Sequence, residues 1–139
     1  MKDGSLLMAF PMSGDKPVPH LEVNADTGNF VYAVAQLPPG KSYMAEGTTC
    51  GWSEYIRLFK EITGASASYQ EKPIDEFVKD IPDRMLGEEL GDMFLYSGEP
   101  GYDGADSSLL TAADIRKVRT VTWLKFAQHE LTVHVADGR

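Results

Sequence analysis

Between Thr48 and Gly64, hydrophobic and polar positions alternate with the period of a helix. Its large apolar side chains recur at three- and four-residue spacings and leave the charged residues on the other side: Trp52, Tyr55, Ile56, Phe59 and Ile62. This pattern predicts an amphipathic helix of about three turns. A side-chain oxygen of Thr48, Thr49 or Ser53 is expected to cap its first N–H groups, and Gly64 to end it in the left-handed conformation.

Weaker helical periods predict further helices. One starts at the capping residues Asp26 and Thr27 and buries Phe30, Val31, Val34 and Leu37. A short helix is expected over Ile74 to Asp80. A longer one follows from about Pro82 to Ser97, with inward positions at Leu86, Leu90, Met93 and Phe94.

The longer helix carries Gly87 and Gly91, four residues apart, a spacing that permits a neighbour to approach its backbone closely. Thr111 is expected to cap a helical turn between Leu109 and Ile115. Thr120 or Thr122 is expected to cap a last helix.

Strand patterns are shorter. Ser5 to Phe10 is an apolar run that predicts a strand buried on both faces, and Ser66 to Glu71 alternates as a strand with one solvated face does. His20 to Val23 and Lys41 to Glu46 are further strand candidates. The fold class expected is α+β: a small mixed sheet of short strands packed with about four to five helices.

Composition adds limits on function. The 139 residues suit one domain, with strand and disorder as alternatives for the tail from about Thr132. A net charge of -8 argues against nucleic acid or an anionic membrane as partner, and no apolar run is long enough to span a bilayer. The single cysteine, Cys50, fits a reducing compartment, so a cytoplasmic protein is expected.

Three local motifs are better explained by structure than by chemistry. The glycines at 98, 101 and 104 resemble a phosphate cradle, but the acidic residues among them oppose an anion, and their spacing departs from that of a calcium loop. His129 and His134 have no second pair of metal ligands. Cys50 has no companion histidine nearby, so a packed cysteine is favoured over a nucleophile, and no metal site is expected.

The order of the segments resembles the C-terminal half of NmrA-like proteins, atypical members of the short-chain dehydrogenase superfamily. The resemblance covers roughly residues 2 to 130 and lies in four successive stretches: KDGSLLMAFPM, the segment from Asp26 to Val31, WSEYIRLFKEITG and GEELGDMFLYSGEPGYDG. It implies the fold of the family's C-terminal subdomain.

The family's dinucleotide-binding signatures are not found in this sequence. It has no glycine-rich turn between a strand and a helix, and no lysine has a tyrosine four residues before it. We therefore expect no nicotinamide cofactor and no dehydrogenase activity.

The resemblance also implies a cleft wall built by the loops after Val18 and after Leu95. Six residues on these loops are candidates for proton transfer on a bound small molecule: His20, Asp26 and Asp103 as catalytic residues, and Glu22, Tyr96 and Tyr102 as ligand-binding residues. The competing interpretation makes Asp26 a helix cap, the tyrosines rim residues and His20 an exposed side chain.

Two functions follow as hypotheses. The first is a stand-alone NmrA-like domain that binds a small apolar metabolite, pairs as a homodimer to cover its apolar flank, and acts as a cofactor-independent cyclase, isomerase or dehydratase of fungal secondary metabolism. The alternative is a non-catalytic regulatory or partner-binding fragment of an NAD(P)-binding protein.

Overall fold

The computed structural model describes residues 5–115, which fall into two compact units. Unit 1 holds residues 5–18 and 50–105, and unit 2 holds residues 19–49 and 106–115.

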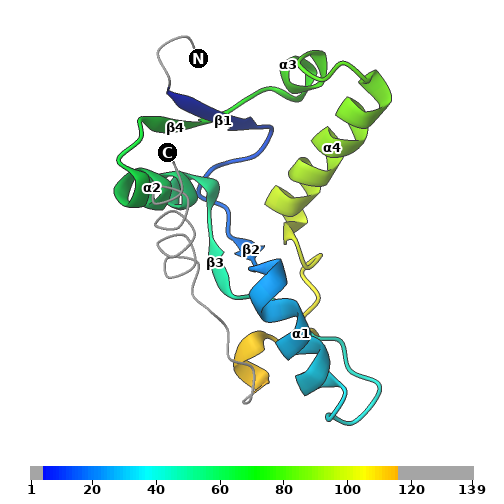
Figure 1. Ribbon diagram of the computed structural model, residues 1–139. Coiled ribbons are helices and arrows are strands. Elements are labelled where there is room, and N and C mark those ends of the chain that lie inside the picture. The colour runs from blue at the N-terminus through cyan, green and yellow to red at the C-terminus, as the bar shows by residue number, and fades with distance from the viewer. Residues whose placement is uncertain (1–4, 116–139) are drawn as a thin grey trace. The chain divides into compact units, whose positions relative to one another are not determined.

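Along the chain the elements are β1 (Leu6–Phe10), β2 (Val18–His20), α1 (Val23–Val34), β3 (Thr48–Cys50), α2 (Trp52–Thr63), β4 (Ala67–Glu71), α3 (Ile74–Lys79), α4 (Arg84–Tyr96), a π-helical turn η1 (Ser97–Gly101) and a 3-10 turn η2 (Ala112–Asp114) (Figure 1). Strands β2 and β3 pair where the chain passes between the units. The predicted α+β class is confirmed.

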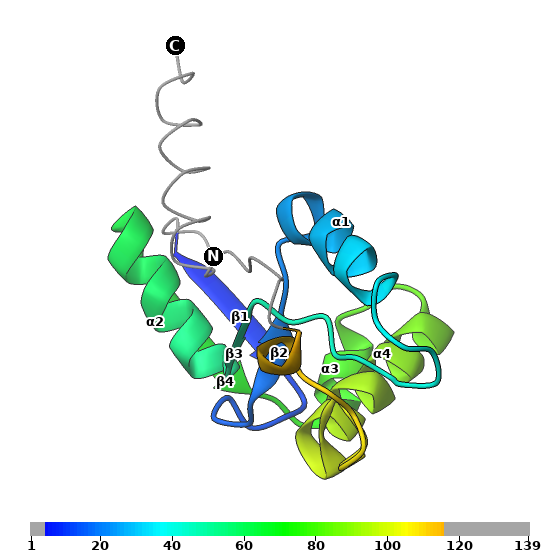
Figure 2. The same ribbon diagram turned by 90° about the horizontal axis from the view of Figure 1, so that it is seen from below.

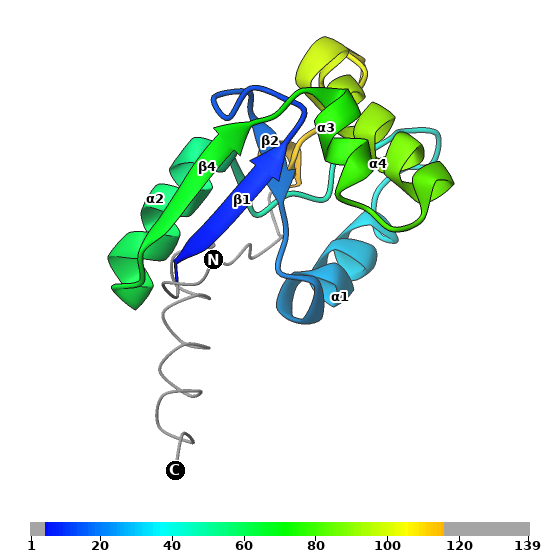
Figure 3. The same ribbon diagram turned by 90° about the horizontal axis from the view of Figure 1, so that it is seen from above.

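Unit 1 is built on a parallel pair of strands. β1 and β4 run in register from Leu6 beside Ala67 to Phe10 beside Glu71 (Figure 3). Helix α2 packs against β4 and runs alongside the pair in Figure 2. The strand predicted over Ser66 to Glu71 is confirmed with its solvated face, since Ala67 is buried while Ser68 and Gln70 are exposed.

Helix α2 ends as its sequence predicts and begins differently. Gly64 closes it in the left-handed region, at φ 69°. The N-cap is Gly51, with no side-chain cap, so the predicted capping by Thr48, Thr49 or Ser53 is wrong. Instead, the backbone carbonyl of Gly14 accepts a hydrogen bond from the Ser53 N–H at 2.9 Å. A distant loop satisfies a donor that a local side chain usually takes.

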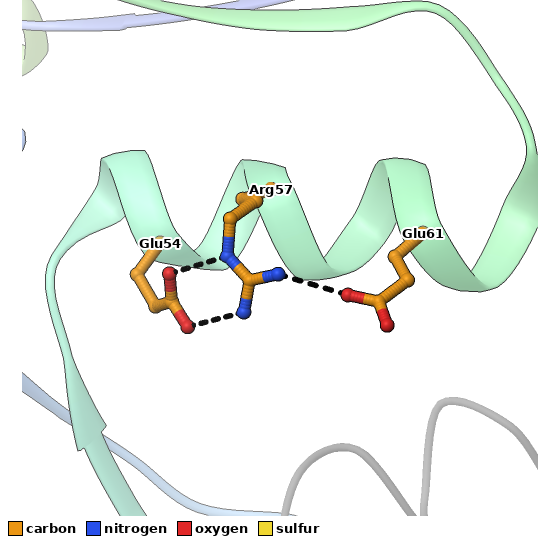
Figure 4. A network of polar contacts seen from close by, with 3 residues as sticks. All are labelled: Glu54, Arg57 and Glu61. Carbon is orange, nitrogen blue, oxygen red and sulfur yellow. Dashed lines mark hydrogen bonds and ion pairs between the residues drawn. The ribbon is translucent and has the colours of Figure 1, made fainter.

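The charged side of α2 carries a small ion-pair network. The Arg57 guanidinium donates to both carboxylate oxygens of Glu54 at 2.7 Å and to Glu61 at 2.9 Å (Figure 4). The pKa of Glu54 is lowered, chiefly by the hydrogen bond from Arg57. All three side chains are largely exposed, so the network adds little to stability.

Aromatic rings form the centre of unit 1. The ring of Phe10 stacks on Phe94 with centroids 4.1 Å apart, and Trp52 meets it edge-on at 4.9 Å. Phe77 and Tyr69 complete the cluster around Phe10. The Tyr69 hydroxyl donates to the Met12 carbonyl at 2.7 Å, and burial, with a smaller effect of Glu71, raises the pKa of Tyr69 to about 12. Through the Phe10 side chain, the cluster joins β1 to β4 and to the helices α2, α3 and α4.

Helices α3 and α4 pack closely, as the two glycines predict (Figure 1). A Cβ atom on Gly87 would lie 3.2 Å from the Val78 carbonyl oxygen, and one on Gly91 would lie 3.0 Å from the Ile74 side chain. Both glycines are buried. Because α4 turns these small residues toward α3, two of its predicted inward residues, Leu86 and Met93, are exposed instead.

Strand β1 corrects another expectation. Leu6 is 41% and Leu7 40% exposed, although adjacent residues of a strand point to opposite faces. The strand is therefore not buried on both faces. The physical reason is that, within residues 5–115, β1 belongs to a sheet of only two strands.

Unit 2 is organised by α1, which begins earlier than predicted. Glu22 is its N-cap, and Asp26 lies inside its first turn. Phe30, Ala33 and Ile115 form the buried cluster, with Leu37 and Tyr43 packed against it, whereas Val31, predicted to be buried, is 64% exposed. Thr111 caps η2 through a reciprocal capping box with Asp114, which confirms the predicted turn.

The prediction of a strand over Lys41 to Glu46 is wrong. The extended segment lies later, at β3, and Tyr43 makes only an isolated bridge with Leu110. The strand predicted over His20 to Val23 is likewise displaced, since β2 ends at His20.

No helix in residues 5–115 combines the length and the apolar composition required to cross a bilayer. His129, His134, the last predicted helix and the tail lie outside the described residues.

Candidate functional site

The six candidate site residues divide equally between the units. His20, Glu22 and Asp26 belong to unit 2, at the end of β2 and the start of α1. Tyr96, Tyr102 and Asp103 belong to unit 1, at the end of α4 and in the turn that follows it. The structure therefore places three of the candidates in each unit.

In unit 2, the acidic residues surround the first turn of α1. The Glu22 carboxylate accepts hydrogen bonds from the backbone N–H groups of Asn24, at 3.2 Å, and Ala25. Asp26 is fully buried, the only side chain so enclosed in the described part of the chain. A carboxylate is favoured near a helix N-terminus by the macrodipole, and its burial is costly unless it is satisfied there. The Glu22 carboxylate therefore caps α1, and the Asp26 carboxyl group is enclosed within its first turn.

In unit 1, Tyr96 ends α4, and Tyr102 and Asp103 lie in the turn that follows η1. The Asp103 carboxylate accepts the backbone N–H of Ala105 at 3.0 Å, which fixes the turn after η1. The hydroxyl of Tyr96 lies over Gly104, within 2.5 Å of where a Cβ atom would sit. Tyr96 and Tyr102 are 53% and 56% exposed, so both rings remain accessible.

Sequence patterns did not find a cavity on α1. Its volume is about 380 Å³, and its lining is almost wholly apolar: Phe30, Val31, Val34, Ala35, Tyr43 and Ala45. Hydrogen bonds from Met44 N–H to the Leu110 carbonyl, at 2.7 Å, and from Leu110 N–H to the Ser42 carbonyl, at 3.0 Å, fix the segment that carries Tyr43. The sequence signal that could have predicted this cavity is the pair Phe30 and Val31. Together they make the apolar stripe of α1 wider than one buried face requires.

A second cavity lies between α3 and α4 in unit 1. Its volume is about 650 Å³, and Ile74, Val78 and Ile81 supply its apolar lining. Charged residues of both signs complete it: Asp75, Lys79, Arg84, Glu88 and Asp92. Arg84 pairs with Glu88 at 2.8 Å. The mixed charges indicate no preferred class of ligand.

The environment of Cys50 disfavours a nucleophile. Burial raises the pKa of the Cys50 thiol, and the nearby Glu54 carboxylate raises it further. A nucleophilic cysteine needs the opposite shift, because the thiolate is the reactive form. Among residues 5–115, no three His, Cys, Asp or Glu side chains are grouped as metal ligands.

The turn at Gly51 does not fit a dinucleotide phosphate. β3, Gly51 and α2 form the nearest approach to a strand–glycine–helix turn. The space above Gly51 is already filled, since a Cβ atom there would overlap the Gly14 carbonyl oxygen, which also takes the Ser53 N–H. A pyrophosphate needs such N–H groups open to it.

Comparison with known proteins shows the class of fold. No protein-family model matches the sequence, and no curated protein matches it. Solved structures with the same fold include a nucleoside-diphosphate-sugar epimerase from Staphylococcus aureus, at 21% identity and TM-score 0.66, covering 88% of this chain and 43% of that one. A triphenylmethane reductase of Citrobacter sp. matches at 15% identity and TM-score 0.62, covering 94% of this chain and 45% of that one.

The same comparison identifies the particular fold as NmrA-like. NmrA, a negative transcriptional regulator solved in complex with NADP, matches over 100% of this chain at 18% identity and TM-score 0.68. The resemblance seen in the sequence is thus confirmed at the level of the fold. The chain spans less than half of these structures, 43–47% of their lengths.

Proposed function

We propose that the chain is an NmrA-like domain that binds a small apolar metabolite in the cavity on α1. The cavity carries this proposal: its volume of about 380 Å³ lies at the lower end of the range for small-molecule sites, and its lining is almost wholly apolar. All six lining residues come from one chain, so binding does not depend on the expected homodimer.

Catalysis is the finer part of the proposal. A cyclase, isomerase or dehydratase moves a proton away from one atom and returns one to another, so it needs an acid and a base but no redox cofactor. Asp26 supports this role best, because it is fully buried and lies on α1 one turn before Phe30, a residue of the cavity. His20, in the same unit, is the second proposed acid/base residue, and Glu22 there is a proposed ligand contact. Asp103 as an acid or base, and Tyr96 and Tyr102 as ligand contacts, are proposed separately in unit 1. We further propose that the chain acts as a cytoplasmic enzyme of fungal secondary metabolism.

Binding is tested with a panel of neutral, apolar metabolites of one or two rings, using perturbed NMR resonances of α1 as the signal. We expect saturable binding to the wild type and a loss of at least about tenfold in Val34→Phe, which fills the cavity. Val23→Phe is the matched control on the same helix, since Val23 is 65% exposed and does not line the cavity. Equal binding by both variants, or none by the wild type, would contradict the proposal.

Catalysis needs a separate test, because a binding protein would pass the first. Turnover of any metabolite that binds is measured for His20→Ala, Asp26→Asn and Asp103→Asn. We expect Asp26→Asn to lower turnover by about a hundredfold while binding persists, as for loss of a general acid or base. Unchanged turnover in all three variants would remove the acid/base assignment and leave the binding proposal intact.

The second candidate is a non-catalytic, partner-binding fragment of an NAD(P)-binding protein. Two observations favour it: the chain spans only 43–47% of the matched structures, and one of those is a regulator bound to NADP. Titration with NADP(H), followed by the fluorescence of the two tryptophans, separates the candidates. We expect no saturable binding by this chain alone, and NADP(H) affinity restored by an added nucleotide-binding half would favour the second candidate.

A further inference from the structure

The side chains that line the cavity on α1 differ in exposure. Three of them are buried or half-buried and form its floor: Phe30, Val34 and Tyr43. The other three are exposed and form its rim: Val31, Ala35 and Ala45. An apolar group of a ligand leaves water at the floor, while the opposite end of the ligand stays in contact with solvent at the rim.

The rim lies at the C-terminal end of α1. Val31 is in the last turn of the helix, Ala35 is its C-cap, and the last turn holds no basic residue. The carbonyl groups at this end of a helix carry a partial negative charge, which favours a nearby cation by about two- to fivefold and disfavours an anion to the same degree. The rim is therefore a place where the charge of a ligand affects its binding.

The backbone donors at this end of α1 are already used. The N–H groups of Ala35 and Leu37 donate to the Val31 and Val34 carbonyls, each at 3.0 Å. The backbone N–H and the side-chain amide of Gln36 also donate to carbonyls of α1, at 3.1 and 3.0 Å. An anion binds well where N–H groups are open to it, so these hydrogen bonds occupy the donors that an anion would need.

The net charge of unit 2 has the same sign as this end of α1. Its described residues hold one lysine, Lys41, against five acidic side chains: Glu22, Asp26, Glu46, Asp106 and Asp114. An excess of negative charge attracts cations and repels anions. Phe30 and Tyr43 in the lining are aromatic, a kind of side chain that attracts organic cations. The helix end, the charge of the unit and the lining thus favour the same sign of ligand charge.

We infer that the ligand of this cavity is an amphiphilic organic cation. Its apolar body of one or two rings occupies the floor, and its tertiary or quaternary ammonium group lies in the solvent at the rim. An alkylated ammonium group is weakly hydrated, so it lies beside apolar rim side chains at a smaller cost than a carboxylate does. This inference rests on the proposed function and adds the charge of the metabolite.

Three probes that share one ring system test the charge: naphthylmethanol, naphthylacetate and naphthylmethyl-trimethylammonium. Their Kd values are measured with the whole chain, from NMR resonances of α1, at about 20 mM sodium chloride. We expect the cation to bind about two- to fivefold more tightly than the alcohol, and the carboxylate about two- to fivefold more weakly. At about 300 mM these differences should shrink, while the Kd of the uncharged alcohol stays unchanged.

A charge added near the rim should change the order of binding. Gln36 is exposed just beyond the end of α1 and does not line the cavity, so Gln36→Lys should weaken binding of the cation about two- to fivefold and leave the alcohol unchanged. Asn24→Lys is the matched control, since it adds the same charge at an exposed position of α1 about 18 Å away along the helix axis. It should change each Kd by less than about twofold.

The outcomes separate this inference from the proposed function. Equal Kd values for the three probes, a carboxylate that binds most tightly, or unchanged binding of the cation by Gln36→Lys would overturn the cationic ligand and leave the apolar site in place. The same conclusion holds if no probe binds but a neutral metabolite of the panel does. If neither a probe nor a panel metabolite binds, the proposed function fails, and this inference fails with it.

Discussion

Gly14 and Gly51 meet at the start of α2 more closely than residues with side chains could. A Cβ atom on Gly14 would overlap the Ser53 hydroxyl and lie 2.5 Å from the Tyr69 ring, and one on Gly51 would overlap the Gly14 carbonyl oxygen. The same carbonyl caps the Ser53 N–H. Two glycines thus allow a loop from early in the chain to take the place of a capping side chain.

Gly14→Ala should therefore destabilise the protein by about 2–3 kcal/mol, as overpacking at a buried backbone contact does. Gly28→Ala is the control, because Gly28 is exposed on α1 and a Cβ atom there meets nothing within 4 Å. It should stabilise the protein by about 1 kcal/mol, through the helix propensity of alanine. Urea unfolding curves measure both, and a Gly14→Ala variant as stable as the wild type would contradict the packing described.

At the scale of elements, the contact of α3 with α4 decides between two opposing effects of alanine. Alanine raises helix propensity by about 1 kcal/mol over glycine, while crowding a packed contact costs about 1–3 kcal/mol. Gly87 faces the Val78 backbone, which cannot move aside, whereas Gly91 faces the end of the Ile74 side chain, which can. The two glycines therefore tolerate a methyl group to different degrees.

We expect Gly87→Ala to destabilise the protein by about 1–2 kcal/mol and Gly91→Ala to have a smaller effect. Adding Ile74→Val should relieve the crowding at Gly91 and leave the loss at Gly87 unchanged, because only Gly91 lies against Ile74. Free energies of unfolding are measured for the single and double variants. They give two double-mutant cycles, one that combines Ile74→Val with Gly87→Ala and one that combines it with Gly91→Ala. Equal coupling of Ile74→Val to both glycines would contradict this account.

Elements with strong local signals were predictable from sequence, and those fixed by distant contacts were not. The end of α2, the α3–α4 glycines and the Thr111 cap all follow from nearby residues. The face of α2 follows only in part, since Ile56 is buried as predicted but Leu58, outside the predicted face, is buried too. The cap of α2 depends on Gly14, 39 positions before Ser53 in the chain, so no local pattern encodes it. The exposure of Leu6 and Leu7 likewise depends on how many strands the sheet has.

The candidate site was predictable only in part, for the same reason. Resemblance selected Asp26, which the structure shows to be fully buried, but it also selected Glu22, whose carboxylate caps α1. The cavity on α1 is lined on one side by Tyr43, whose segment is held by Leu110 far along the chain. Periodicity reports which side of a helix is apolar and cannot report which part of that side remains uncovered.

For the whole molecule, the comparisons and strand β1 both bear on whether the described residues cover the apolar surface of the chain. The chain spans 43–47% of structures that share its fold, and β1 leaves apolar residues exposed on both faces in the described part. Parallel strands are normally covered on both faces. The chain therefore has a surface suited to association, although its net charge of -8 opposes association between copies.

This opposition predicts how the expected homodimer responds to salt. An apolar contact gains no attraction from charge, so added salt acts mainly by screening the repulsion between two chains of -8. The Kd for dimerisation should therefore fall several-fold between about 20 mM and about 300 mM sodium chloride, since the Debye length shortens from about 20 Å to about 6 Å. Sedimentation equilibrium across this range measures the change, and Leu7→Lys, which places a charge on an exposed residue of β1, tests whether β1 is part of the contact. A Kd that rises with salt would mean that ion pairs hold the dimer together, and β1, which has no charged residue, could not then be its main contact.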